Sequence, residues 1–216
     1  MSGLPAAATA AGSDADTREL VFTLHGLART RLSMAWLARS LEREGYRVVN
    51  WGYRSSTATV AEFGRALADE VARQAGEAPR IHFVGHSLGN IVVRWMLAHA
   101  PPPRPGRVVM LAPPNQGSRA ADRYARWLGR LLRPLPELRT AADSTARTLP
   151  RSAGTEIGII AGRFDAKVSV AESHLAEATA SLVVPAAHTF VMNRRDVRGL
   201  VLRFLRTGSF EAPAVG

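Results

Sequence analysis

The segment with the clearest capacity for chemistry is the run GHSLG at residues 85–89. It directly follows the apolar run IHFV and directly precedes LGNIVVRWML, whose apolar residues recur at helical spacing. A serine in so tight a turn between strand and helix is held in a strained backbone conformation, and glycines on both sides give it room. The helix start behind it offers free N–H groups to a developing oxyanion. This context favours Ser87 as a nucleophile, on a turn made by Gly85, His86 and Gly89, over the alternative that it merely caps a helix.

A serine nucleophile needs a histidine that accepts its proton, and in this strand-turn-helix arrangement the histidine follows the nucleophile in the chain. Of six histidines, only His174 and His188 lie after Ser87 and beyond the middle of the predicted sheet. His188 follows the last apolar run, SLVV, which places it at the carboxyl end of a strand. We therefore predict His188 as the base, with His174 as the alternative. The others precede Ser87 or end the helix after it, namely His25, His82, His86 and His99.

The acid that orients the histidine should come from a strand end between the nucleophile and the base. Asp165 follows the strand-like run EIGIIAGRF and is the predicted acid. Glu172, slightly further along the chain, is the alternative. Two other carboxylates fit less well, because Asp143 lies in a predicted insertion and Asp196 follows the histidine.

The surrounding sequence alternates between strand-like and helix-like patterns, as these residues require if they are to meet at one edge of a sheet. Apolar runs of strand length lie at residues 19–24, 46–50, 80–84, 107–111, 156–161 and 181–184. Apolar residues at helical spacing lie at residues 34–41, 60–71, 88–96 and 197–205. Strands separated by helices predict an α/β fold with a mostly parallel sheet of about six strands and helices on both faces. Catalytic residues then gather at the carboxyl ends of the strands.

Residues 113–154 interrupt this alternation and form a lid-like insertion after the fourth strand. Within it, residues 118–133 predict a basic amphipathic helix. Its apolar stripe comprises Ala121, Tyr124, Leu128 and Leu131. Its arginine stripe comprises Arg119, Arg123, Arg126 and Arg130. The favoured interpretation is a hydrophobic cover over the Ser87 cleft, because most amphipathic helices bury their apolar face against their own protein. Peripheral contact with an anionic membrane is the second interpretation.

Taken together, these motifs resemble the small bacterial lipases and esterases of the α/β-hydrolase superfamily, over about residues 19–207. The resemblance is carried by FTLHGLAR at 22–29, FVGHSLGN at 83–90, VVMLAPPNQGS at 108–118, AGRFDAKVSV at 161–170 and HTFVMNRRDVRGLVLRFL at 188–205. Relatives often have a second glycine after the GHSLG run, where this chain has Asn90. The resemblance implies the α/β-hydrolase fold and a Ser-His-Asp serine hydrolase.

The resemblance also implies an oxyanion hole made by two backbone N–H groups. One belongs to Leu88, directly after the nucleophile, and the other to Leu27, where Gly26 lets the backbone approach closely. A carboxylic ester, including a lipid ester, is the expected substrate, and the chemistry requires neither metal nor organic cofactor. Thioester hydrolysis or acyl transfer on the same triad is the alternative, and a non-catalytic binding protein on this fold is a further one.

Length and composition agree with a single enzyme domain. The 216 residues fit one domain, expected at 17–208, with a flexible N-terminal tail at 1–16 and a C-terminal tail at 209–216. Cysteine is absent, which excludes disulfides and thiolate chemistry. The formal charge is +10, but without an aromatic-basic motif it does not indicate nucleic-acid binding, and no obligate protein partner is expected. Residues 1–16 do not resemble a secretory signal and no apolar run is long enough to span a bilayer, so a cytoplasmic location is expected.

Overall fold

The computed structural model describes residues 17–152 and 154–211, and it centres on one parallel sheet. Six strands pair in the order β2-β1-β3-β4-β5-β6, and every pairing is parallel. The strands are β1 (Leu20–Leu24), β2 (Arg47–Trp51), β3 (Ile81–His86), β4 (Pro105–Leu111), β5 (Ile157–Gly162) and β6 (Ala180–Val184). This confirms the predicted sheet. The predicted N-terminal tail lies outside the described residues, and of the predicted C-terminal tail only residues 209–211 are described.

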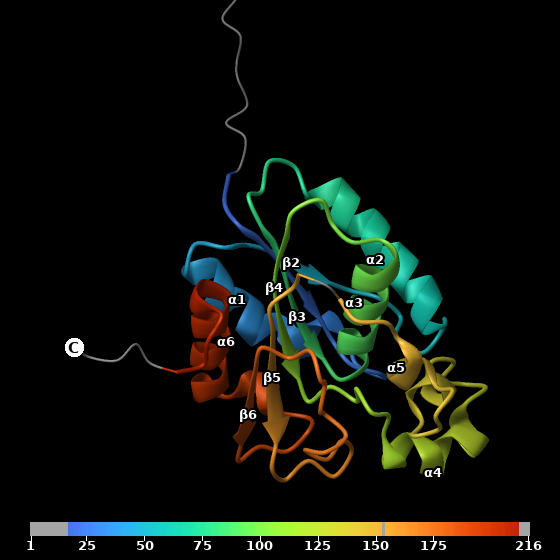
Figure 1. Ribbon diagram of the computed structural model, residues 1–216. Helices are drawn as coiled ribbons and strands as arrows, with labels where there is room; N and C mark the ends of the chain where they lie inside the picture. The colour runs from blue at the N-terminus through green and yellow to red at the C-terminus, as the bar shows by residue number, and fades with distance from the viewer. Residues whose placement is uncertain (1–16, 153, 212–216) are drawn as a thin grey trace, which may run out of the picture.

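Helices cover both faces of the sheet, as predicted, because each parallel connection must return the chain to the same edge. On one face lie α2 and α3, and on the other α1 and α6 (Figure 1). Their bounds are α1 (Ala35–Arg43), α2 (Val60–Gln74), α3 (Leu88–His99) and α6 (Arg195–Thr207), with short 3₁₀ turns at Arg31–Met34 and Val191–Asn193. Each face buries its own apolar cluster, and Phe210 extends the second cluster by packing on Phe204.

The strand order brings the predicted catalytic segments together. Strands β1 and β3 are neighbours, and Leu24 lies opposite Gly85 in their register, so the chain leaves both strands side by side. The connection from β1 runs to β2 on one side while β3 lies on the other, which is the kind of switch point where α/β sheets bind ligands. Strands β5 and β6 also end together, with Gly162 opposite Val184, so the segments after them meet in the same way.

The insertion between β4 and β5 contains α4 (Arg119–Leu128), a 3₁₀ turn at Leu135–Leu138 and the single-turn α5 (Thr145–Thr148). The helix predicted over 118–133 is therefore wrong at its C-terminal end, since α4 stops at Leu128 and both Arg130 and Leu131 lie beyond it. Gly129 weakens the helix directly after this point, and Pro134 disfavours helical backbone in the residue before it.

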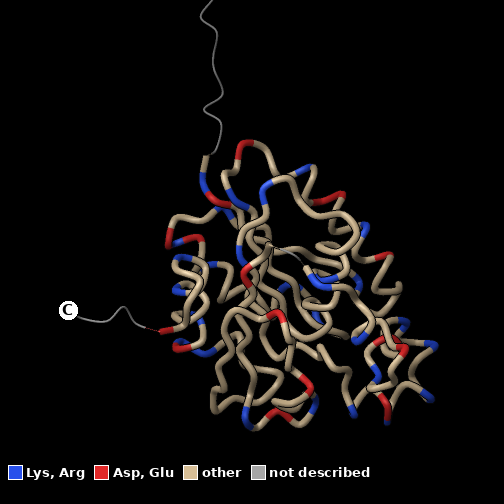
Figure 2. Tube along the Cα trace, viewed as in Figure 1, with Lys and Arg blue, Asp and Glu red and all other residues tan. Residues whose placement is uncertain are grey.

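Charged residues are distributed widely over the fold. Figure 2 shows lysine and arginine on all sides of the trace rather than gathered on one element. Within residues 17–152 and 154–211, no helix is both long and apolar enough to span a membrane.

Candidate active site

The turn between β3 and α3 holds Ser87 in a backbone conformation that side chains rarely adopt, with φ 51° and ψ −121°. Such strain persists only where the surroundings enforce it. A Cβ atom on Gly85 would lie 2.3 Å from the Asn90 side chain, and one on Gly89 would lie 2.8 Å from the carbonyl oxygen of Leu24. Only glycine fits at either position, as the sequence predicted. The turn therefore lifts Ser87 out of the strand and holds it at the start of α3.

Asn90, which stands where relatives often have glycine, has a structural role of its own. Its side chain is buried against Gly85, and its Nδ2 donates a hydrogen bond of 3.0 Å to the carbonyl oxygen of Leu111 at the end of β4. Its backbone N–H donates to the carbonyl oxygen of Ser87 at 3.0 Å. The asparagine therefore ties the turn to the neighbouring strand.

The loop after β1 packs directly against the nucleophile. A Cβ atom on Gly26 would lie 3.1 Å from the Cβ of Ser87, so the backbone approaches this closely only because residue 26 is glycine. Leu27, the next residue, lines the same cavity as Ser87, and Leu88 begins α3. The two residues predicted to supply oxyanion N–H groups thus flank the serine.

Tyr53 supports this loop, and sequence reasoning did not single it out. Its hydroxyl donates a hydrogen bond of 2.7 Å to the carbonyl oxygen of His25, and its ring stacks on the His25 imidazole with centroids 4.4 Å apart. Burial raises the pKa of the Tyr53 phenol, so it remains a donor across the physiological range. No local pattern around Tyr53 points to this contact, which depends on β2 pairing with β1.

The predicted base and acid meet in the segments after β6 and β5. His188 Nδ1 lies 2.6 Å from Asp165 Oδ2, and the carboxylate is fully buried. The other carboxylate oxygen of Asp165 accepts 2.8 Å hydrogen bonds from the backbone N–H groups of Lys167 and Val168. These two donors hold the carboxylate in place and leave its second oxygen for the imidazole. With Nδ1–H donating to Asp165, Nε2 of His188 is the nitrogen that can accept a proton.

The alternative residues lie elsewhere. Glu172 accepts hydrogen bonds from the backbone N–H groups of Ser169 and Arg119, so it is occupied in fixing the start of α4. His174 is exposed, and its carbonyl oxygen accepts a hydrogen bond from Gln116. The structure brings neither side chain to Ser87.

His86 takes a part that its place in the turn did not reveal. Its Nε2–H donates a hydrogen bond of 2.9 Å to the carbonyl oxygen of His188, and the two rings lie 4.8 Å apart. Burial, and then the charge of His188, hold the pKa of His86 well below its usual value, so the ring is neutral. The neutral ring thus anchors the backbone of the residue predicted to be the base. Its position between Gly85 and Ser87 was the only available signal.

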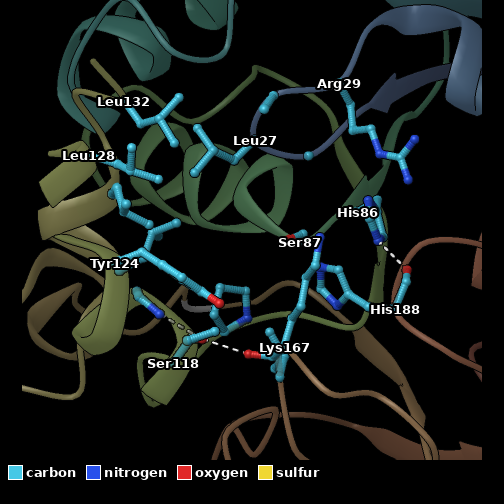
Figure 3. Close-up of a pocket in the computed structure, with 18 residues that line it drawn as sticks. Leu27, Arg29, His86, Ser87, Ser118, Tyr124, Leu128, Leu132, Lys167 and His188 are labelled. Carbon is cyan, nitrogen blue, oxygen red and sulfur yellow. Dashed lines mark hydrogen bonds between the residues drawn. The ribbon is translucent and has the colours of Figure 1, made fainter. Parts of the chain in front are cut away.

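A cavity of about 240 Å³ opens over Ser87 and His188 (Figure 3). The insertion forms one end of it, where Leu128, Leu132 and Leu135 are among the lining residues. The other end holds Arg29, His86, Ser87, Lys167 and His188, with Gly26 and Leu27 alongside. The insertion thus contributes to the wall of the cavity that contains the serine. Among the residues that the structure describes, no cluster of three or more His, Asp or Glu side chains could hold a metal ion.

The comparisons with known proteins agree with this fold. The sequence profile described as "Alpha/beta hydrolase family" matches residues 20–207. The chain belongs to this family. No curated protein sequence matches the chain.

Solved structures of similar fold include three from other organisms. The mature lipase BlEst2 of Bacillus licheniformis is 18% identical, with a TM-score of 0.67 over 89% of this chain and 93% of the lipase. The pyrethroid hydrolase of Sphingobium faniae JZ-2 is 15% identical, with a TM-score of 0.62 over 88% and 98%. The esterase Pf2001 of Pyrococcus furiosus is 20% identical, with a TM-score of 0.62 over 88% and 83%. At these identities, the shared feature of this α/β hydrolase and the three enzymes is the fold.

Proposed function

We propose that this α/β hydrolase cleaves carboxylic esters through an acyl-enzyme formed on Ser87. The observation that carries the proposal is the 2.6 Å hydrogen bond between His188 and the buried Asp165, beside a strained serine in the same cavity. A buried carboxylate that fixes an imidazole and leaves Nε2 free is the arrangement that activates a serine hydroxyl. The lipase and esterase among proteins of this fold agree with an ester substrate.

In the proposed cycle, His188 Nε2 takes the hydroxyl proton of Ser87 as the oxygen attacks the ester carbonyl carbon. The backbone N–H groups of Leu27 and Leu88 receive the oxyanion, and such donors typically contribute several kcal/mol to transition-state stabilisation. The C–O bond to the alcohol then breaks, and His188 returns the proton to the departing oxygen. Water attacks the acyl-enzyme by the same route and releases the acid, which restores Ser87.

The apolar end of the cavity is the proposed acyl site. Leucines from α4 and from the turn after it line this end, so an acyl chain placed there is withdrawn from water. In this interpretation the insertion serves as the hydrophobic cover, and its side chains determine the acyl length that fits. The proposed acyl leucines are Leu128, Leu132, Leu135 and Leu138.

Two other functions are separable by simple measurements. A thioesterase or an acyltransferase would use the same residues. The thioesterase would prefer a thioester in competition with an ester of the same acyl chain, and the acyltransferase would transfer the acyl group to an alcohol in place of water. A non-catalytic binding protein on this fold would turn over neither ester nor thioester. The buried Asp165 carboxylate favours the enzyme, because a binding protein has no need of an oriented imidazole.

Labelling with a fluorophosphonate tests the proposal directly. The probe should modify Ser87 in the wild-type chain, and Ser87→Ala should fold normally while losing both labelling and ester hydrolysis. Ser144→Ala, at a buried serine whose hydroxyl has no hydrogen-bond partner among the described residues, is the matched control and should retain both. Full hydrolysis by Ser87→Ala would contradict the proposal.

A further inference from the structure

Two cations line the cavity beside the nucleophile. Arg29 comes from the loop after β1 and Lys167 from the loop after β5, and both belong to the cavity wall that contains Ser87. Figure 3 shows the Lys167 side chain extending toward Ser87 from one side, with Arg29 on the opposite side near His86. None of the aspartate and glutamate residues that the structure describes lines the cavity. Its polar end therefore has two cations on its wall, while the Asp165 carboxylate, which is bonded to His188, is buried and does not line the cavity.

Neither side chain has a hydrogen-bond or ion-pair partner among the residues that the structure describes. Some other cations of the fold are bound internally. The Arg107 guanidinium binds the Glu156 carboxylate at 2.7 Å, and the buried Arg94 donates to the carbonyl oxygen of Ala146 at 2.8 Å. Arg29 and Lys167 are thus free to bind an anion in the cavity, and their positive field already contributes to the lowered pKa of His86.

The two ends of the cavity suit the two halves of an ester substrate, the acyl chain and the leaving group. The leucine-lined end suits the acyl chain, while the leaving oxygen must lie within reach of His188, which returns its proton. Lys167 follows Asp165 by two residues and its backbone N–H holds that carboxylate, so it lies on the His188 side. Arg29 lies near His86, whose ring is 4.8 Å from that of His188, so both cations lie at the His188 end of the cavity (Figure 3).

We propose that the preferred substrate carries an anionic group, such as a carboxylate or phosphate, on its leaving-group half, and that Arg29 and Lys167 bind it. This inference rests on the proposed ester hydrolysis. The bond that breaks is the acyl C–O bond, the proton from Ser87 passes through His188 to the leaving oxygen, and the anionic group is released unchanged on the alcohol. A neutral ester of similar size forgoes the charge-assisted contacts and is the poorer substrate.

The test compares two phenyl esters with the same acyl chain, 3-acyloxybenzoate and 3-acyloxybenzamide, which differ in charge at one position. We expect higher kcat/KM for the benzoate, and we expect this preference to weaken as salt is raised. Arg29→Gln and Lys167→Gln should each reduce the benzoate-to-benzamide ratio by about fivefold, the upper end for an exposed ion pair. Arg39→Gln, which removes an exposed charge from α1 outside the cavity, should leave the ratio unchanged.

Equal kcat/KM for the two esters, or a ratio unaffected by both substitutions, would overturn the inference. Turnover of the neutral benzamide ester and its loss in Ser87→Ala report on the proposed function separately. A second readout requires no turnover. The product 3-hydroxybenzoate should protect Ser87 from fluorophosphonate better than 3-hydroxybenzamide, and the advantage should disappear in the double variant.

Discussion

The turn around Ser87 and the insertion over it bound the same cavity and are built in opposite ways. In the turn, strained backbone is held by contacts that leave no space for a single Cβ atom, at Gly85 and Gly89. In the insertion, α4 has one buried residue, Ala121, and both Trp127 of α4 and Leu131 beyond its end are more than 70% exposed. The geometry proposed for chemistry is thus fixed at the ends of paired strands, while the insertion leaves large apolar side chains on its outer surface.

This contrast separates two kinds of constraint. Displacement of a proposed catalytic atom by an ångström costs rate directly, so those groups lie at the ends of paired strands, where the register fixes them. An acyl chain is recognised by apolar contact, which has no direction and tolerates small movements of the wall. Changes in the turn should therefore have large effects, and changes in the insertion should have smaller ones.

The largest effect is expected from the proposed acid. Asp165→Asn removes the carboxylate that fixes the His188 imidazole, and it should lower kcat by about 10⁴-fold while the chain remains folded. Glu172→Gln, at a carboxylate that binds only backbone N–H groups near α4, is the control and should change kcat little. The measurement is steady-state hydrolysis of an activated ester. The reverse pattern would move the acid to Glu172.

A smaller effect, on stability, is expected from packing in the turn. The Cβ atom of Gly89→Ala would meet the carbonyl oxygens of Leu24 and His25 at 2.8 and 2.9 Å, so the substitution should cost about 1–3 kcal/mol of unfolding free energy. Gly199→Ala, in α6 with open space around it, should instead stabilise by up to about 1 kcal/mol. Trp127→Ala in the insertion should stay within about 0.5 kcal/mol. Urea unfolding of the three variants measures their unfolding free energies. An equal loss for the Gly89 and Trp127 variants would contradict the contrast between the turn and the insertion.

The turn should also contribute to the loss of stability at acid pH. Burial lowers the pKa of His86 below 6.5, so the unfolded chain takes up this proton first as the pH falls. The stabilisation is complete above about pH 6.5 and is lost as the pH falls below it. His86→Gln should therefore flatten the decline in unfolding free energy between about pH 7.5 and 5.5. The unfolding free energy of His174→Gln, at an exposed histidine, should decline in parallel with that of the wild type. A parallel decline for His86→Gln would show that the buried ring contributes nothing.

The smallest effect concerns the outer surface of the insertion. Exposed Trp127 and Leu131 lie among Arg123, Arg126 and Arg130, and this combination suits the interface of an anionic bilayer. We propose that this surface binds phosphatidylglycerol vesicles weakly, at about 1 kcal/mol per arginine, in co-sedimentation at low salt. High salt, or glutamine at all three arginines and Arg119, should abolish the binding. Absence of binding at low salt would leave the insertion as a cover alone.

The sequence predicted the strands and the residues at their ends because both depend on local patterns. Apolar runs bounded by turns located β3, and the glycines of GHSLG required a turn there. Chain order and strand position then selected His188 and Asp165 over His174 and Glu172, and the structure places the first two in contact. These inferences needed the chain order of nucleophile, acid and base, together with the rule that parallel strands end at one edge.

The features that the sequence did not predict are contacts between distant segments. The hydrogen bond from His86 to the His188 carbonyl spans 102 residues, and that from Tyr53 to His25 joins the segments after β2 and β1, two strands whose pairing the sequence did not specify. The end of α4 was missed because arginine and leucine at helical spacing continue past Gly129. The free cations were missed because lack of a partner is a property of the folded surface.

One further consequence follows from the place of β6 at the edge of the sheet. This strand pairs only with β5, whereas β3, which leads to Ser87, is paired on both sides. An edge element with neighbours on one side opens at lower free energy than the centre of the core. His188 follows β6, so fraying of this edge would separate imidazole from carboxylate while the serine stayed in place. The resistance of the proposed activity to heat or denaturant therefore depends on the edge strand β6. We expect loss of activity to precede unfolding of the core.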